Sequence, residues 1–392
     1  MYVPRSRLFD LRPRLAMRLG MVAALGLMAV CAVVLLALSG AVFALMHSWQ
    51  SLNEGAPLTT LASSLAAVLA AYVGARLAAV LCVPPPVPEG VRLLRDAAPD
   101  FYQLIDQIAA HLGADRIDRV WVTRDINASV MQRARWGCVG RIDTHLMLGL
   151  SLVHSVSRSQ LSAVLAHEFA HLAVQRRGLG KVGAHLRAWW LRVLDAACEA
   201  MPMIEPLADR SLRRFYRNML RLSRIEEFEA DAMAAQFVGA GLLGETLVEV
   251  TLKERFLRQD YWPKVMAQSE VRARPSIRPY REMGLGVEAG FLRPSSVRAA
   301  TEALFEEGAE DAFPFHPSLH ERLRALRVPL RAAPADRPSA ASHYFAPLLP
   351  TLAWVFDRAW WQDARSGWRD QYRGASDSKG RRSRSSDRTG SD

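Results

Sequence analysis

The sequence predicts a mainly α protein with a small β-sheet, attached to an N-terminal transmembrane helical hairpin. Three observations lead to this fold class. Two long apolar stretches lie near the N-terminus, two short segments in the middle of the chain alternate like strands, and apolar residues recur at helical spacing over much of the remainder. At 392 residues, with half of them hydrophobic and 23% charged, the chain can also bury a sizeable core outside the membrane.

The two apolar stretches are long enough to be membrane spans. Leu19–Met46 contains 28 residues without a formal charge, and Leu58–Ala75 contains 18. About 20 apolar residues cross the hydrocarbon core as a helix, and Arg76 can snorkel and lengthen the second span toward Val83. A cleaved signal peptide is the alternative for the first stretch, but its apolar core would exceed the usual ~7–15 residues and a second span follows directly.

The charges that flank the spans predict their orientation. The loop 47–57 has no Lys or Arg. The flanks are basic, through Arg5, Arg7, Arg12, Arg14 and Arg18 before the first span and Arg76, Arg92 and Arg95 after the second. The positive-inside rule therefore places both the N-terminus and the long C-terminal part in the cytoplasm. The high Ala, Arg and Leu content indicates a bacterial source, so a bacterial inner membrane is the expected location. Much of the net charge of +11 lies in the two termini, so we expect no specific binding of nucleic acid.

The expected organisation follows composition along the chain. The predicted segments are a basic cytoplasmic N-terminus (1–18), the transmembrane hairpin (19–83), a Pro-rich linker (84–90), a main domain (91–345), an aromatic-rich C-terminal helix (346–373) and a disordered basic tail (374–392). For the aromatic-rich helix, packing on the core is the preferred interpretation and anchoring at a membrane interface the alternative. The four cysteines are scattered and form neither a disulfide framework nor a metal motif.

Within the main domain, the pattern predicts strands followed by helices. Val91–Leu112 has helical spacing, whereas Val120–Thr123 and Arg141–Gly149 indicate short strands separated by an irregular connection. Ser157 and Gln160 form a predicted capping box, which opens a helix that ends near residues 175–177.

A second helix carries a group of acidic residues. Ser223 and Glu226 form another predicted capping box, and the helix that it starts is expected to run to Val238. The Arg-rich residues 181–222 before it have helical character, as an amphipathic pair packed on the domain or lying on the membrane surface.

The first capped helix contains HEFAH, with His167 and His171 four residues apart. Residues i and i+4 share one helix face, so both imidazoles can bind one Zn²⁺. Glu168 would project beside the metal and take a proton from a bound water. The alternative is an ordinary buried helix, but unliganded histidines in an apolar environment would be unfavourable.

A third ligand must come from another helix. The pattern H-E-x-x-H-x-x-G-x-x-H is excluded, because Val174 and Arg177 occupy the Gly and third His positions. Glu227 and Asp231 are i and i+4 on the second capped helix and can face the same way. Spacing alone leaves Glu226 and Glu229 open as alternatives to Glu227.

These motifs resemble those of the gluzincin membrane metallopeptidases that include the HtpX proteases and the CAAX prenyl proteases. The family combines H-E-x-x-H with S-R-x-x-E-[FY]-x-A-D, which matches SRIEEFEAD at 223–231. The resemblance implies an α+β zincin-like catalytic domain that holds one Zn²⁺ per chain. It also implies that Glu227 is the third zinc ligand and that Asp231 supports a ligand histidine by a hydrogen bond.

Two further motifs extend the resemblance. Asn127 and Ala128 are similar to an N-A-[FY] edge segment, which implies binding of the substrate backbone. His316, Pro317 and Arg322 are similar to H-P-x-x-x-x-R, which implies that His316 and Arg322 lie near the scissile carbonyl oxygen as catalytic groups. A two-span hairpin cannot build the seven-span chamber of the prenyl proteases, so prenyl-peptide specificity is not implied.

The expected function is that of a membrane-anchored, zinc-dependent metalloendopeptidase. The resemblance implies polypeptide substrates, namely misfolded or damaged membrane proteins, besides contact with the lipid bilayer. One alternative is a dedicated processing peptidase with a single substrate. Another is a catalytically silent membrane scaffold, which the presence of Glu168 disfavours because a scaffold needs no general base.

Overall fold

The structure is a computed structural model and describes residues 5–82, 86–136, 139–175, 180–200, 205–291, 294–306, 316–331 and 338–386. The chain forms two compact units. The first comprises Met1–Val87, Gln132–Thr144 and Leu172–Glu227, and the second comprises Pro88–Met131, His145–His171 and Phe228–Asp392. Two continuous helices, α5 (Arg158–Gln175) and α7 (Glu205–Val238), contribute residues to both units.

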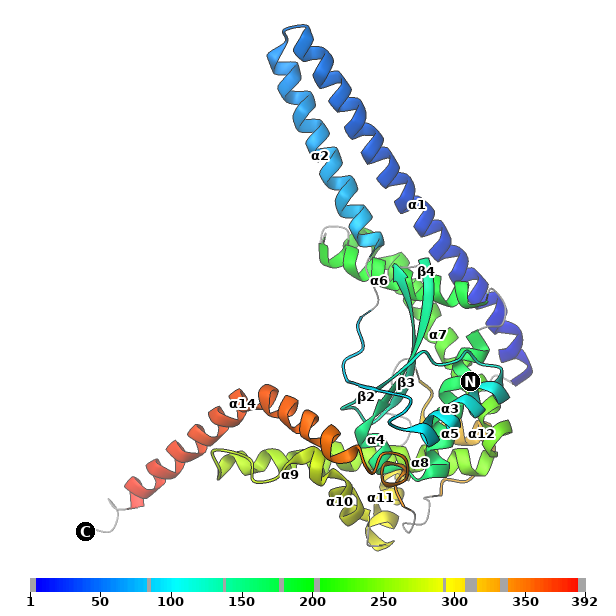
Figure 1. Ribbon diagram of the computed structural model, residues 1–392, viewed down its shortest axis with the longest axis vertical. Coiled ribbons are helices and arrows are strands. Elements are labelled where there is room, and N and C mark those ends of the chain that lie inside the picture. The colour runs from blue at the N-terminus through cyan, green and yellow to red at the C-terminus, as the bar shows by residue number, and fades with distance from the viewer. Residues whose placement is uncertain are drawn as a thin grey trace. The chain divides into compact units, whose positions relative to one another are not determined.

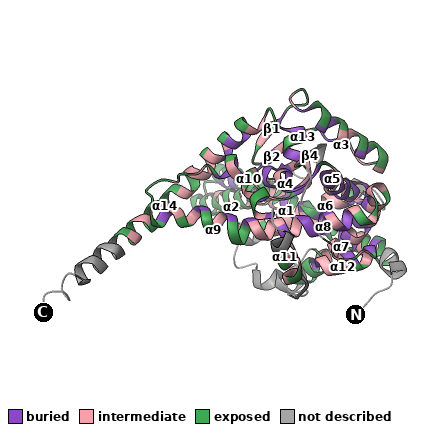
Figure 2. Ribbon diagram, turned by 90° about the horizontal axis from the view of Figure 1, so that it is seen from below, coloured by how far each residue is buried: buried purple, intermediate pink, exposed green. Residues whose placement is uncertain are grey.

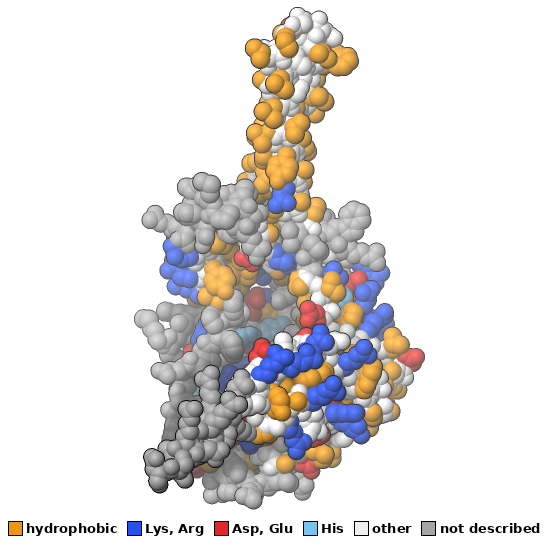
Figure 3. All heavy atoms as spheres, turned by 90° about the vertical axis from the view of Figure 1, so that its left-hand side faces the viewer, with side chains coloured by type: hydrophobic (Ala, Val, Ile, Leu, Met, Phe, Trp, Pro, Cys, Tyr) orange, Lys and Arg blue, Asp and Glu red, His pale blue; other side chains and the backbone are white. Residues whose placement is uncertain are grey.

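The first unit contains the predicted hairpin. Helices α1 (Arg5–Asn53) and α2 (Pro57–Leu81) run side by side and are joined by a three-residue turn (Figure 1). Both are long and apolar enough to cross a membrane. Apolar side chains cover their outer surface (Figure 3), and Leu36 and Phe43 are 71% and 74% exposed. Such a surface is unfavourable in water and fits a lipid environment. A bent pair, Leu212–Val238 with Ala240–Glu270, passes the same test only when counted as one segment.

Helix α6 (Gly180–Ala200) and the first part of α7 pack against the hairpin. The Trp189 Nε1 donates a hydrogen bond of 3.0 Å to the Leu81 carbonyl oxygen. Gly26 lies against the Trp190 ring, where a Cβ atom would overlap the ring. Phe215 and Leu222 of α7 pack on α1. The prediction that a helix starts at Ser223 was wrong. α7 passes through Ser223 without a break and begins 18 residues earlier, at Glu205.

A small sheet has the strand order β1-β2-β4-β3 among the described residues. Its strands are β1 (Val91–Leu93), β2 (Arg119–Thr123), β3 (Ala128–Trp136) and β4 (Val139–Gly149). β1 is antiparallel and β4 parallel to β2. The predicted strands correspond to β2 and β4. The prediction of an irregular connection was wrong, because β3 occupies it as an edge strand whose Gln and Arg residues hide the alternation. β1 also replaces the start of the helix predicted from Val91.

Helices make up most of the second unit. They are α3 (Pro99–Leu112), α4 (Leu150–Ser155), α8 (Ala240–Phe256), α9 (Trp262–Ala267), α10 (Pro279–Phe291), α11 (Pro294–Glu306), α12 (Leu319–Leu326), α13 (Ala340–Tyr344) and α14 (Leu349–Ser386), with a π-helical turn at Leu257–Tyr261 and a 3-10 turn at Gln268–Glu270. One core cluster joins Val248, Leu252, Phe291 and Leu323 from α8, α10 and α12. The fold is therefore mainly α with a small sheet, as predicted.

The aromatic-rich segment forms α14. Trp368 is fully buried, and its Nε1 donates a hydrogen bond of 2.9 Å to the Arg272 carbonyl oxygen. This contact supports packing on the core as the preferred interpretation. α14 continues to Ser386 and so includes residues 374–386, which were predicted as part of a disordered tail.

Candidate metal centre

Helix α5 is capped as predicted and deeply buried. The Ser157 N–H donates to Gln160 Oε1 at 2.9 Å, and the Gln160 N–H donates to Ser157 Oγ at 3.4 Å. These two bonds satisfy N–H groups that a helix start leaves without partners. Apolar side chains such as Leu161, Leu165 and Phe169 are fully buried along the helix, which is coloured largely as buried in Figure 2. A helix fixed in this way holds its side chains in a defined direction.

His167 and His171 lie one turn apart on α5 and face each other. Their Nε2 atoms are 3.1 Å apart, and the two rings meet edge to face. His167 is 9% exposed and His171 is half-buried. Two Nε2 atoms directed at one point can bind the same metal ion.

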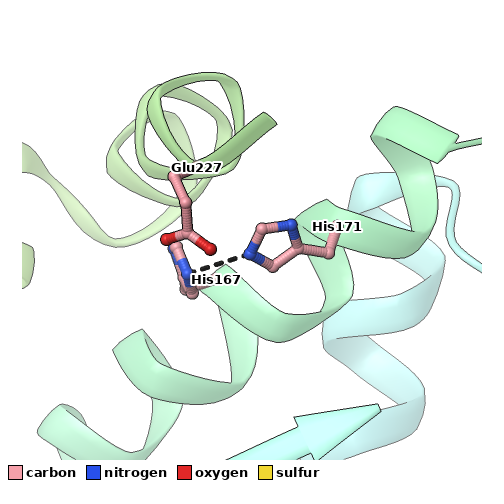
Figure 4. Close-up of side chains that lie close together, drawn as sticks. All are labelled: His167, His171 and Glu227. Atoms are coloured by element: carbon pink, nitrogen blue, oxygen red, sulfur yellow. Dashed lines mark hydrogen bonds between the residues drawn. The ribbon is translucent and has the colours of Figure 1, made fainter. Parts of the chain in front are cut away.

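Glu227 of α7 completes the group. Its carboxylate is 2% exposed, and ligand atoms of His167, His171 and Glu227 lie within 4.8 Å of one another. Figure 4 shows the carboxylate directed toward the two imidazoles. Of the three acidic residues that spacing left open, the structure brings Glu227 to the histidines, whereas Glu226 lies in an ion pair with Arg12.

Asp231 contacts His167 at Nδ1, the ring nitrogen that is not directed at His171. Its Oδ1 lies 3.0 Å from His167 Nδ1, so that the Nδ1–H can donate to the carboxylate and leave Nε2 available to a metal. Arg322 donates from Nε to Oδ2 at 2.8 Å and from Nη2 to Oδ1 at 2.6 Å. Burial opposes ionisation of Asp231, yet the charge and hydrogen bonds of Arg322, together with His167, hold the pKa of this carboxyl well below its usual range.

Helix α12 places Arg322 at this carboxylate. A capping box of Ser318 and Glu321 starts α12, and the buried Leu323 fixes the helix to the core. His316 is exposed and lies three residues before this helix begins. Sequence reasoning did not pair Arg322 with Asp231, because 91 residues separate them and no local pattern connects them.

Glu168 follows His167 on α5 and is half-buried. Neighbouring residues on an α-helix project about 100° apart. Glu168 therefore projects beside the direction of the His167 ring rather than along it, as expected of a group that acts on a bound water and does not bind the metal.

Asn127 and Ala128 lie where the edge strand β3 begins. The Asn127 carbonyl oxygen accepts a hydrogen bond of 2.9 Å from the Gly149 N–H, and its side chain is exposed. Gly149 is required there, since a Cβ atom would overlap the Asp125 and Asn127 carbonyl oxygens. This contact fixes the start of the strand and leaves its binding of substrate a prediction.

The donor set fits zinc. Catalytic Zn²⁺ is commonly held by three protein ligands, two imidazole nitrogens and a carboxylate oxygen among them, with a fourth position open for water. His167, His171 and Glu227 supply these donors, and Asp231 fixes the tautomer of one of them.

Comparison with known proteins gives a family match for the region that contains this centre. Residues 141–330 match the model of peptidase family M48. The match contains the three candidate ligands, Asp231 and Arg322, and it ends before α14. No curated protein and no solved structure matches the chain.

Proposed function

Residues 141–330 are a domain of peptidase family M48, the zinc metallopeptidase family of the HtpX and CAAX prenyl proteases, and from this membership we propose that the chain is a membrane-anchored, zinc-dependent endopeptidase. One observation carries the proposal. His167, His171 and Glu227 bring two imidazoles and one carboxylate within 4.8 Å of one another, on helices that converge from distant parts of the chain.

We assign to the residues around the centre the roles that peptide hydrolysis requires. Bound zinc would act as a Lewis acid on the scissile carbonyl group and on a water molecule. Glu168 takes a proton from the attacking water and returns it to the leaving amine. His316, three residues before α12, is assigned the role of helping to stabilise the developing oxyanion, on the basis of the H-P-x-x-x-x-R motif. Arg322 contributes positive charge on the same side while its two hydrogen bonds hold Asp231.

The hairpin directs the activity to substrates at a membrane. The arginines on both flanks of the predicted spans, Leu19–Met46 and Leu58–Ala75, favour a catalytic domain on the cytoplasmic side, which we propose to be that of a bacterial inner membrane. We therefore propose misfolded or damaged membrane proteins as substrates, with the edge strand at Asn127 and Ala128 pairing with the substrate backbone.

The proposal is tested by hydrolysis of casein with the full chain in detergent. Wild type is compared with Glu168→Gln and with Glu288→Gln, which removes an exposed carboxylate on α10 as a matched control. Zinc content is measured in all three samples. We expect Glu168→Gln to retain zinc and to lose at least about a hundredfold in kcat, the scale of general base catalysis. Equal cleavage by wild type and Glu168→Gln would overturn the mechanism.

A second experiment addresses the substrate class. In cells that carry Glu168→Gln in place of wild type, proteins that are normally degraded should accumulate. Accumulation of many membrane proteins supports quality control. Accumulation of a single uncleaved precursor would instead indicate a dedicated processing peptidase, and unchanged protein levels would indicate a scaffold.

A further inference from the structure

Arg12 is a buried charge at the N-terminal end of the first membrane helix. It is 6% exposed, whereas Arg14 and Arg18 on the same helix are exposed. The exposed pair fits the usual role of basic residues that flank a membrane span. A guanidinium that is removed from water needs hydrogen-bond or ion-pair partners in the protein. The role of Arg12 therefore differs from that of the exposed arginines that flank the span.

The partners of Arg12 belong to the two helices that carry the candidate zinc ligands. Its Nη2 donates a hydrogen bond to the carbonyl oxygen of Val174 at 2.5 Å, and Val174 follows His171 by three residues on α5. The same Nη2 lies 3.6 Å from Glu226 Oε1, and Glu226 directly precedes Glu227 on α7. One side chain of the membrane helix thus reaches both α5 and α7.

A second arginine strengthens the link to α7. Arg187 of α6 is 6% exposed, and its Nη2 lies 3.8 Å from the same Glu226 oxygen. Burial lowers the pKa of the Arg187 guanidinium and Arg12 lowers it further, while Glu226 raises it. Glu226 Oε1 therefore lies within ion-pair distance of two buried guanidinium groups, whose charge favours this position of the carboxylate.

Apolar packing runs along the same helices. Leu19, two turns after Arg12, is 2% exposed and packs with Phe215 and Leu222 of α7. Trp190 of α6 packs against this cluster. Leu222 lies five residues and Glu226 one residue before Glu227, so the contacts of α1 with α7 continue along the helix up to the residue that precedes Glu227.

We propose that Arg12 is a positioning residue for the metal centre, so that the cytoplasmic end of the membrane helix supports the zinc ligands and is more than a tether. Arg12 acts through Glu226 on the neighbouring Glu227 and through the Val174 carbonyl group on the end of the HEFAH helix. This inference rests on the proposed zinc site and adds to it a residue that lies 155 positions before His167.

The test compares two arginines of one helix in the full chain in detergent. Arg12→Met keeps the length and apolar stem of the side chain, and Arg14→Met is the exposed control. Zinc affinity is measured by competition with a chromophoric chelator, and the ligand geometry is followed by the visible absorption of bound Co²⁺. Support lost beyond the ligands themselves typically weakens metal binding by 10–100-fold, so we expect about a tenfold loss for Arg12→Met and no change for Arg14→Met. Arg12→Lys, which keeps the charge and one donor, should recover part of the loss.

The outcomes separate this inference from the proposed function. Glu226→Gln, which preserves the shape of the side chain, serves as a second variant if Arg12→Met does not fold, and it should weaken zinc binding in the same direction. Wild-type zinc affinity and an unchanged Co²⁺ spectrum in Arg12→Met, or in Glu226→Gln, would overturn the role of Arg12 and leave the zinc site intact. Failure of wild type and Arg14→Met to bind zinc would instead overturn the proposed function.

Discussion

Replacing Asp231 by asparagine removes a negative charge that three hydrogen-bond donors share, with almost no change in shape. Asp231 is 1% exposed and accepts bonds of 2.6 and 2.8 Å from Arg322, while His167 Nδ1 lies 3.0 Å away. In Asp231→Asn, the guanidinium of Arg322, whose side chain is 15% exposed, is left without its counter-ion.

The magnitude follows from the burial of this pair. Removal of one partner of a buried ion pair costs about 3–5 kcal/mol, because the remaining charge stays desolvated. The burial of Asp231 and the two-point contact with Arg322 place this pair in that range, so we expect the free energy of unfolding of the zinc-free protein to fall by about 3 kcal/mol. Loss of the acceptor behind a ligand histidine typically weakens metal binding by 10–100-fold, and we expect the same for zinc in Asp231→Asn.

The assay measures both quantities on the same samples. Chemical denaturation of the zinc-free protein in detergent gives the free energy of unfolding, and chelator competition gives the zinc affinity. Asp260→Asn is the control, because Asp260 is 52% exposed and pairs with the exposed Lys264, a type of contact worth at most about 1 kcal/mol. If Asp231→Asn changed stability by less than about 1 kcal/mol and zinc affinity by less than about twofold, the supporting role of Asp231 and Arg322 would be refuted.

Three other changes have defined outcomes. His171→Ala should reduce bound zinc from one per chain to a substoichiometric amount while the circular dichroism spectrum stays helical; one retained zinc per chain would exclude His171 as a ligand. Burial lowers the pKa of His154 to about 4 from an ordinary 6.5, so the unfolded chain binds more protons than the folded one between these values. Protonation of His154 should therefore lower the free energy of unfolding by about 2 kcal/mol from pH 7 to pH 5. Denaturation of His154→Leu at both pH values should show a pH dependence that is smaller by this amount. Phe101 is fully buried among Tyr102, Tyr344 and Phe345. Phe101→Ala should lower the free energy of unfolding, measured with denaturant, by about 3–5 kcal/mol, and a loss of less than about 1 kcal/mol would contradict the contribution of this cluster.

Local signals in the sequence predicted α5 and its two candidate ligands, His167 and His171. The Ser157–Gln160 capping box, the apolar residues around HEFAH and the spacing of His167 and His171 are all set within one helix, and the structure has each of them. Glu227 needed the resemblance to a known family, because its neighbours Glu226 and Glu229 have the same chemistry. The choice among them depends on how α7 is rotated, and distant contacts determine that rotation.

Tertiary packing explains the errors. Ser223 has the pattern of a helix start, but Phe215 and Leu222 pack on α1 and continue α7 through it, so burial outweighs the local capping preference. The edge strand β3 was missed because its Gln and Arg residues interrupt the alternation of apolar and polar residues that marks a strand.

Long-range contacts of buried arginines could not be predicted from the sequence either. Arg322 reaches Asp231 across 91 residues, and Arg12 reaches Val174 across 162. From the sequence, Arg12 counted only as one of several basic residues before a membrane span. The burial that distinguishes it from Arg14 arises from the arrangement of α1, α6 and α7, which no local pattern encodes.

The most direct test of the metal centre is zinc-edge X-ray absorption on the purified full chain, with Glu227→Ala measured alongside. The account predicts one zinc per chain with only nitrogen and oxygen neighbours at about 2.0–2.2 Å, and a spectrum that changes, or a metal that is lost, in Glu227→Ala. Sulfur neighbours at about 2.3 Å, or a spectrum that Glu227→Ala leaves unchanged, would contradict a site built from His167, His171 and Glu227.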